Sequence, residues 1–177
     1  MEFEQRNDVT AEEYLEMIRL KTAVLLAASL KIGARLGGAS VEDADRLYDF
    51  GMHIGVAFQL KDDLLDVYGN AKVFGKNIGG DILCNKKTYM LIKALEHANA
   101  DQHNQLNSWI NAETFQPAEK IAAVTELYDR IGVKAVCENK ILEYSNRAME
   151  SLAAVSIAEE KKEELKKIIE NLIHREV

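Results

Sequence analysis

Three aspartates stand close together in an otherwise apolar segment, Phe58-Gln59-Leu60-Lys61-Asp62-Asp63-Leu64-Leu65-Asp66. In a helix, Asp62 and Asp66 lie four residues apart on one face. Gln59 and Asp63 then flank the same stripe. Carboxylates at such short range repel one another unless a cation lies between them. Mg²⁺ binds one or two carboxylates and completes its shell with water and phosphate oxygens, so this spacing predicts a magnesium site.

The alternative is a solvent-exposed helix face on which aspartates occur by chance. Aspartate is a poor helix former because its side chain competes for backbone hydrogen bonds. The leucines at positions 60, 64 and 65 also make the segment more apolar than a surface that serves solubility alone. We therefore favour the metal site.

Cations follow the aspartates. A glycine-rich loop over 69–80 contains Lys76, and Lys86 comes six residues after it. Glycines suit a backbone that bends tightly or approaches a ligand, and such loops before a helix often bind anions. We expect Lys76 and Lys86 to neutralise phosphate oxygens opposite the aspartates. The G-x-x-x-x-G-K-[ST] spacing is absent and no strand precedes the loop, which excludes a P-loop.

Two further positions leave alternatives open. Asp81 is a helix cap, which we favour, an ion-pair partner of Lys76 or Lys86, or a group that orients a metal-bound water. Lys21 and Thr22 are flanked by apolar residues on both sides. A lysine that borders a core generally has an anionic partner, so this pair is either ordinary helix surface or a phosphate contact.

Composition limits the class of protein. The chain has 177 residues, 47% of them hydrophobic, and a single proline, which favours one domain of long helices over 1–177. A net charge of −7 argues against a nucleic-acid partner. Cys84 and Cys137 lack metal-ligand spacing and indicate reduced thiols of a cytoplasmic protein. The most apolar segment, 22–30, is too short for stable membrane insertion.

Helical periodicity and capping signals predict an all-α bundle of five or six helices. The expected helices cover about 11–36, 40–68, 85–100, 117–152 and 157–175. The first and last begin at capping boxes, Thr10-x-x-Glu13 and Ser156-x-x-Glu159. Segment 101–116 is expected to be irregular apart from a turn around Trp109, whose role we leave open.

Glycines refine this pattern. Gly51 and Gly55 fall within the second helix, where they either lower stability or permit close helix packing, and we favour packing. Gly132 is expected to be a weak point of the helix that Pro117 opens.

These residues resemble a known family. The segment 58–66 is similar to the second aspartate-rich motif of the trans-isoprenyl diphosphate synthases, also called polyprenyl synthetases. Lys21-Thr22 resembles the Lys-Thr pair of the preceding helix. Gly75-Lys76, followed by Asp81 and Asn85-Lys86, resembles the segment after the motif. The similarity is close over 12–95 and looser in the remainder.

The resemblance implies a head-to-tail prenyltransferase that joins an allylic diphosphate to isopentenyl diphosphate with Mg²⁺. It assigns one magnesium ion mainly to Asp62, with Asp63 and Asp66 supporting it directly or through water. It assigns the allylic diphosphate to the residues Lys21, Thr22, Gln59, Lys76 and Lys86. It also implies an all-α, homodimeric, cytoplasmic enzyme.

The sequence departs from the family in one large respect, because a first Asp-Asp-x-x-Asp motif is absent from these residues. We therefore expect the chain to be the C-terminal half of a synthase, with little activity alone and an exposed apolar face. A silent helical subunit of a heteromeric synthase is the alternative. A class I terpene cyclase fits less well, since those enzymes carry an Asn/Ser/Glu metal triad. The residues that would set product chain length are not in this sequence.

Overall fold

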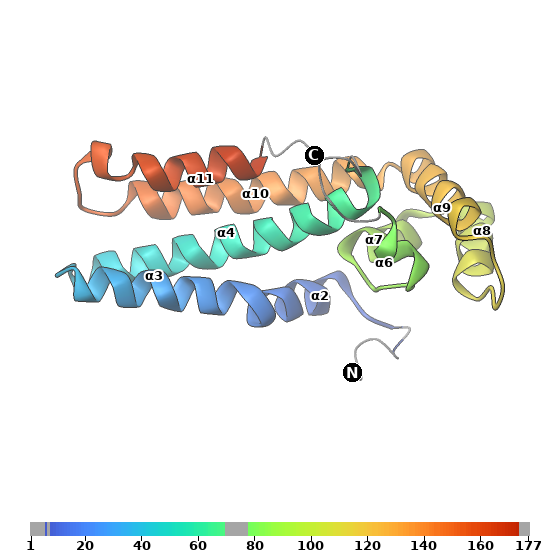
Figure 1. The fold of residues 1–177 in the computed structure, drawn as a ribbon, viewed down its shortest axis with the longest axis horizontal. Coiled ribbons are helices and arrows are strands. Elements are labelled where there is room, and N and C mark those ends of the chain that lie inside the picture. Colours follow the sequence, from blue (N-terminus) through green and yellow to red (C-terminus); the bar gives the residue numbers. More distant parts are fainter. Residues whose placement is uncertain (1–5, 7, 70–77, 174–177) are drawn as a thin grey trace. The chain divides into compact units, whose positions relative to one another are not determined.

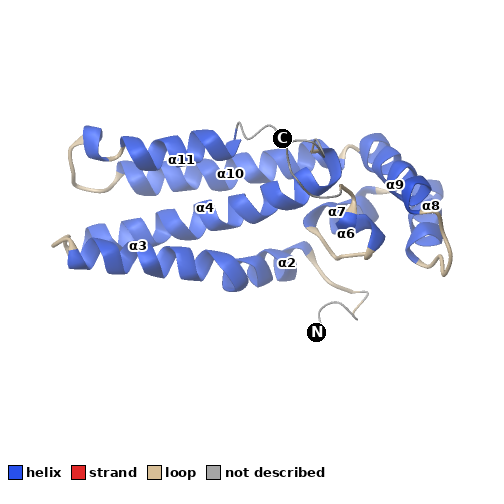
Figure 2. Ribbon diagram, viewed as in Figure 1, coloured by secondary structure: helices blue, strands red, loops and turns tan. Residues whose placement is uncertain are grey.

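A computed structural model describes residue 6 and residues 8–69 and 78–173. Within these ranges the chain is built from helices and connecting loops, without strands (Figure 2). The predicted all-α fold is confirmed.

The colours of Figure 1 follow the helical elements along the chain from the N-terminus to the C-terminus. These elements are α2 (Ala11–Ile18), η1 (Arg19–Ala23), α3 (Val24–Leu36), α4 (Val41–Tyr68), α6 (Gly80–Leu83), α7 (Tyr89–His97), α8 (Ala100–Ile110), α9 (Pro117–Ile131), α10 (Val133–Ala153), η2 (Glu159–Lys161) and α11 (Glu163–Ile173). Backbone contacts divide them into two compact units. The first contains the described part of Met1–Tyr14 and Asp62–Glu138, and the second contains Leu15–Lys61 and the described part of Asn139–Glu176. The expectation of a single domain stays a prediction.

Two glycines allow helices of the second unit to approach closely. A Cβ atom built on Gly51 would lie 2.7 Å from the Cα of Ala27, and one built on Gly55 would lie 2.7 Å from the Cα of Ala23. Real Cβ atoms do not come this near to a backbone, so α4 packs directly on η1 and α3 at these points. The packing interpretation of both glycines is confirmed.

We expect Gly55→Ala to lower the free energy of unfolding by about 1–3 kcal/mol, because the new methyl group forces the backbones apart. The matched control is Gly33→Ala in α3, where an added Cβ would meet nothing within 4 Å. That change should stabilise the helix by up to about 1 kcal/mol. Urea unfolding of both variants measures the difference, and equal effects of the same sign would contradict the packing described here.

Side-chain contacts tie the start of α4 to the end of α10 in the second unit. The Asp43 carboxylate accepts the Ser156 backbone N–H at 2.9 Å and an Arg46 N–H at 3.0 Å. The predicted capping box at Ser156 is wrong. The chain forms the short 3₁₀ turn η2 instead, Ala158 offers no side-chain cap, and α11 begins only at Glu163.

In the first unit, α9 packs against α6, α7 and α8. The helix predicted over 85–100 is present but shorter, as α7. Asn85 adopts a left-handed φ of 50°, and Thr88 caps the helix by accepting the Leu91 N–H at 3.3 Å. The prediction that 101–116 is irregular is wrong over most of this segment, because α8 covers Ala100–Ile110. Asn99 and Gln102 form a capping box that begins α8, which includes Trp109.

Other helix boundaries agree with the sequence. Thr10 and Glu13 form the predicted reciprocal capping box, with bonds of 2.9 and 3.2 Å. Asp43 N–H donates to Ser40 Oγ at 3.0 Å where α4 begins. Pro117 opens α9, and Gly132, with a φ of 83°, ends it and separates it from α10. Gly132 is therefore a helix break, which is stronger than the weak point predicted.

One apolar face of α3 is open to solvent. Leu25, Ile32 and Leu36 are 74%, 60% and 85% exposed, and their spacing places them on one side of the helix. We call these three residues the apolar stripe. Isolated exposed apolar residues are common, but a row of them marks a contact surface. The large exposed apolar face expected of a half-bundle stays a prediction.

Candidate functional site

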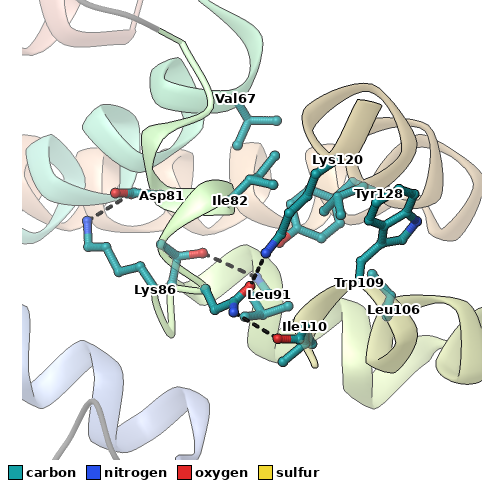
Figure 3. Close-up of a pocket in the computed structure, with 13 residues that line it drawn as sticks. Val67, Asp81, Ile82, Lys86, Leu91, Leu106, Trp109, Ile110, Lys120 and Tyr128 are labelled. Carbon is teal, nitrogen blue, oxygen red and sulfur yellow. Dashed lines mark hydrogen bonds and ion pairs between the residues drawn. The ribbon is translucent and has the colours of Figure 1, made fainter. Parts of the chain in front are cut away.

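A buried aspartate organises the charged groups of the first unit. Asp63, on α4, is only 2% exposed. Its Oδ2 accepts the hydroxyl hydrogen bond of Tyr14, and its Oδ1 accepts from Lys86 Nζ at 3.1 Å. Lys86 Nζ also donates to Asp81 Oδ2 at 2.8 Å (Figure 3). Tyr14, Asp63, Asp81 and Lys86 form what we call the acid–lysine cluster.

Burial and charge act in opposite directions in this cluster. Burial raises the pKa of Asp63 to about 6, while Lys86 and the Tyr14 hydroxyl oppose the shift. Burial lowers the pKa of Lys86, but the charges of Asp63 and Asp81 outweigh it and leave that pKa above its usual value. Lys86 therefore stays protonated near neutral pH, and its positive charge keeps a buried carboxylate ionised.

The other two aspartates of α4 have different surroundings. Asp66 Oδ2 accepts the backbone N–H of Asp81 at 2.9 Å, at the start of α6, and burial raises the pKa of Asp66. Asp62 is partly exposed. Within the described part of the chain, its carboxylate has no hydrogen-bond or ion-pair partner. As far as the described residues go, Asp62 is thus the aspartate of the motif with both oxygens available to a ligand.

This arrangement changes the expected metal site. Among the described residues, no three acidic, histidine or cysteine side chains lie close enough to hold an ion by themselves. The three aspartates do not converge on one point, since Asp63 is turned to Tyr14 and Lys86. The set still fits Mg²⁺, which takes one or two carboxylates and fills its remaining positions with water and phosphate oxygens. Asp62, with the remaining lone pairs of Asp66, fits this role.

Three of the predicted residues lie in the second unit. Lys21 and Thr22 belong to η1, a π-helical turn, and such turns often occur at functional sites. Thr22 Oγ1 donates to Gln59 Oε1 at 2.7 Å, so these two residues are brought together. Lys21 is exposed, which agrees with the surface interpretation, and its contact with a phosphate stays a prediction.

The remaining predictions have separate outcomes. Of the three interpretations of Asp81, the ion pair with Lys86 is present. The helix cap that we favoured is wrong, because Asp81 lies inside α6 and the residue at its N-cap is Gly79. Gly75 and Lys76 lie outside the described residues. Trp109 is half-buried and lines a small pocket together with residues of α4, α6, α7, α8 and α9.

Sequence reasoning missed three residues of this region, Tyr14, Asn85 and Lys120. Tyr14 lies far from the motif in sequence, and no local pattern marks it. Asn85 was noted only as the neighbour of Lys86. Lys120, on α9, is only 1% exposed and donates to Asn85 Oδ1 at 2.7 Å. A buried lysine inside an amphipathic helix cannot be told from a surface lysine by sequence alone.

Fold and site together define an all-α protein whose Asp62-Asp63-x-x-Asp66 motif pairs a buried aspartate with a lysine from the following segment. Comparison with known proteins agrees with this class. The sequence profile of the Polyprenyl synthetase family matches residues 1–128. The chain belongs to the polyprenyl synthetase family.

Individual relatives match over nearly the whole chain. A short chain isoprenyl diphosphate synthase of Methanothermobacter thermautotrophicus is 38% identical over 99% of this chain and 53% of its own length. A (2E,6E)-farnesyl diphosphate synthase of Mycobacterium tuberculosis is 32% identical over 98% of this chain and 49% of its own length. The chain thus spans about half the length of these relatives.

Solved structures show the same relation. A crystal structure of a geranylgeranyl pyrophosphate synthase superposes with a TM-score of 0.91 at 36% identity, covering 99% of this chain and 55% of that one. The synthase of Corynebacterium glutamicum complexed with isoprenyl diphosphate and magnesium has a TM-score of 0.88 at 30% identity, covering 98% and 49%. In the described residues, none of the helices is both long and apolar enough to cross a membrane.

Proposed function

We propose that this chain carries the second aspartate-rich half of a Mg²⁺-dependent trans-prenyltransferase site. The whole enzyme would condense an allylic diphosphate with isopentenyl diphosphate. The observation that carries the proposal is the acid–lysine cluster: a protonated Lys86 is held between Asp63 and Asp81. Asp62, which has no partner among the residues that the structure describes, stands next to Asp63 in α4.

Each residue of the first unit has a stated task in this proposal. Lys86 faces the negative charge that develops on the departing diphosphate, and its two carboxylate partners fix its position beforehand. Asp62 would hold the metal ion, which when bound supplies positive charge to the same phosphate oxygens. Asp63 keeps Lys86 charged and in place without contacting the ion itself. Asp66 would complete the metal's ligands while it anchors the start of α6.

Further assignments come from the family resemblance. They give the allylic diphosphate to Lys21, Thr22, Gln59 and Lys76 as well. The magnesium and isoprenyl diphosphate named for the related Corynebacterium glutamicum synthase support the choice of metal and substrate class. A cytoplasmic homodimer is part of the same proposal.

The second candidate is a silent helical subunit of a heteromeric synthase. The apolar stripe on α3 favours association with another polypeptide. Since the chain spans about half of its relatives, we also propose that it has little transferase activity alone. In the silent-subunit case, the acid–lysine cluster would be a structural ion pair without a ligand.

Titration calorimetry with inorganic pyrophosphate, with and without Mg²⁺, separates the two candidates. We expect this chain to bind pyrophosphate in Mg²⁺ and to lose that binding in EDTA, while labelled isopentenyl diphosphate and an allylic diphosphate give little elongation. Absence of Mg²⁺-dependent binding would favour the silent subunit. Elongation at the rate of an ordinary synthase would refute the proposed inactivity of the chain alone.

A further inference from the structure

Lys120 is a buried cation without a carboxylate partner among the described residues. Its ammonium group donates to Asn85 Oδ1 at 2.7 Å and lies 4.2 Å from the centre of the Phe115 ring. Burial lowers the pKa of Lys120. Placing an ammonium group in such surroundings costs free energy unless its contacts compensate. Its one hydrogen-bonded side chain in the described residues, Asn85, is therefore the place to look for its role.

Asn85 has the one left-handed backbone conformation among the described non-glycine residues, with a φ of 50°. Both polar atoms of its side-chain amide form hydrogen bonds. Nδ2 donates to the carbonyl of Ile110 at 2.9 Å, and Oδ1 accepts from Lys120. Ile110 is the last residue of α8, where carbonyl groups lack partners within the helix. One side chain thus links an unusual turn to α8 and α9.

This turn leads directly into Lys86. The Lys86 backbone N–H donates to the Asp81 carbonyl at 3.0 Å, while its side chain contacts Asp63 and Asp81. The pocket beside Lys86 and Lys120 has a volume of about 20 Å³, room for about one water molecule (Figure 3). A diphosphate has no room in this pocket, so we look for the role of Lys120 in its contact with Asn85.

We propose that Lys120 and Asn85 are positioning residues that fix the turn before Lys86 and thereby aim its ammonium group at the diphosphate. This inference rests on the proposed function, because it assumes that Lys86 binds a diphosphate. On this view, the free energy spent on burying Lys120 serves to hold Lys86 in place. The effect passes through Asn85, which Lys120 contacts and which directly precedes Lys86.

The test compares Lys120→Met, which keeps the apolar stem, with Asn85→Gly, which keeps the left-handed turn but removes both anchors. We expect each to weaken Mg²⁺–pyrophosphate binding by about tenfold. The matched control is Lys134→Met. The Lys134 ammonium group lies 4.8 Å from the centre of the Tyr68 ring, so this variant also removes a lysine that contacts an aromatic ring. It should leave the affinity unchanged.

A double variant shows whether the effect passes through Lys86. In a Lys86→Met background, Lys120→Met should cause no further loss of pyrophosphate affinity, although its effect on thermal stability persists. The proposal would be overturned if the losses of affinity caused by Lys86→Met and Lys120→Met multiplied in the double variant. It would also be overturned if Lys120→Met lowered the stability but left pyrophosphate binding normal. Either result would make Lys120 a purely structural residue.

Hydrogen exchange keeps the inference testable apart from the proposed function. If the unmodified chain does not bind pyrophosphate, the proposed function fails, but the exchange rate of the Lys86 amide still reports on the turn. We expect the Lys86 amide to exchange faster in Lys120→Met and in Asn85→Gly. In Lys134→Met its exchange rate should be unchanged. An unchanged rate in all three variants would show that Lys120 and Asn85 do not hold the turn.

Discussion

Lys86→Met will destabilise this chain by about 2–3 kcal/mol at pH 8. Breaking a fully buried ion pair from one side costs about 3–5 kcal/mol, and we discount that figure because the Lys86 side chain is 40% exposed. The cost arises at Asp63, which stays buried but loses its cation. Urea unfolding at fixed pH measures the change. Pyrophosphate binding should be weaker in the same variant but still measurable.

The penalty of Lys86→Met will shrink as the pH falls. In the unmodified protein the pKa of Asp63 is already raised to about 6. Removing Lys86 raises it further, so the folded state binds a proton more readily than the unfolded state. When the pKa of a carboxyl group is higher in the folded state than in the unfolded state, the free energy of unfolding falls as the pH rises through that pKa. Unfolding at pH 5 should therefore show a smaller difference from the unmodified chain than at pH 8.

The double variant Asp63→Asn/Lys86→Met is the control for this argument. It removes both charges of the pair, so no buried carboxylate is left uncompensated. We expect it to recover most of the stability lost in Lys86→Met. A double variant as unstable as Lys86→Met would mean that packing, and not the buried charge, causes the loss.

Asp62→Asn will have the second large effect, on binding and not on stability. Its carboxylate lacks a partner in the described residues, so neutralising it should change the unfolding free energy by less than about 0.5 kcal/mol. Mg²⁺-dependent pyrophosphate binding should fall by about a hundredfold, because the metal loses its principal protein ligand. Calorimetry in Mg²⁺ and in EDTA measures the difference.

Asp49→Asn provides the comparison for Asp62→Asn. Asp49 is also an exposed acidic residue of α4, but it lies outside the aspartate motif. We expect its neutralisation to leave the Mg²⁺-dependent affinity unchanged. Equal losses in both variants would point to the net charge of the chain and would count against a metal site at Asp62.

Local sequence signals predicted much of the fold. The capping box at Thr10, the proline at the start of α9 and the glycine that ends it each act within a few residues, so they can be recognised in sequence. The aspartates, Lys86 and its pairing with Asp81 could also be anticipated, because all lie within one continuous segment. The close packing at Gly55 followed from its position in a long apolar helix.

The errors have a common physical origin in contacts between distant residues. The support of the metal by Asp63 stays a prediction, but its contacts with Tyr14 and Lys86 could not be anticipated from its position beside Asp62. The break at Asn85 depends on anchors from α8 and α9, which no pattern near Asn85 reveals. The capping box at Ser156 failed because Asp43, 113 residues away, takes its backbone N–H.

The π turn at Arg19–Ala23 has a consequence for any comparison of this chain with its relatives. A π turn contains one residue more than an α turn, and one residue rotates the following helix by about 100°. A relative with an unbroken α-helix here needs a one-residue gap in the alignment. Without that gap, every position between the turn and Leu36 would be matched to the wrong side of the neighbouring helix.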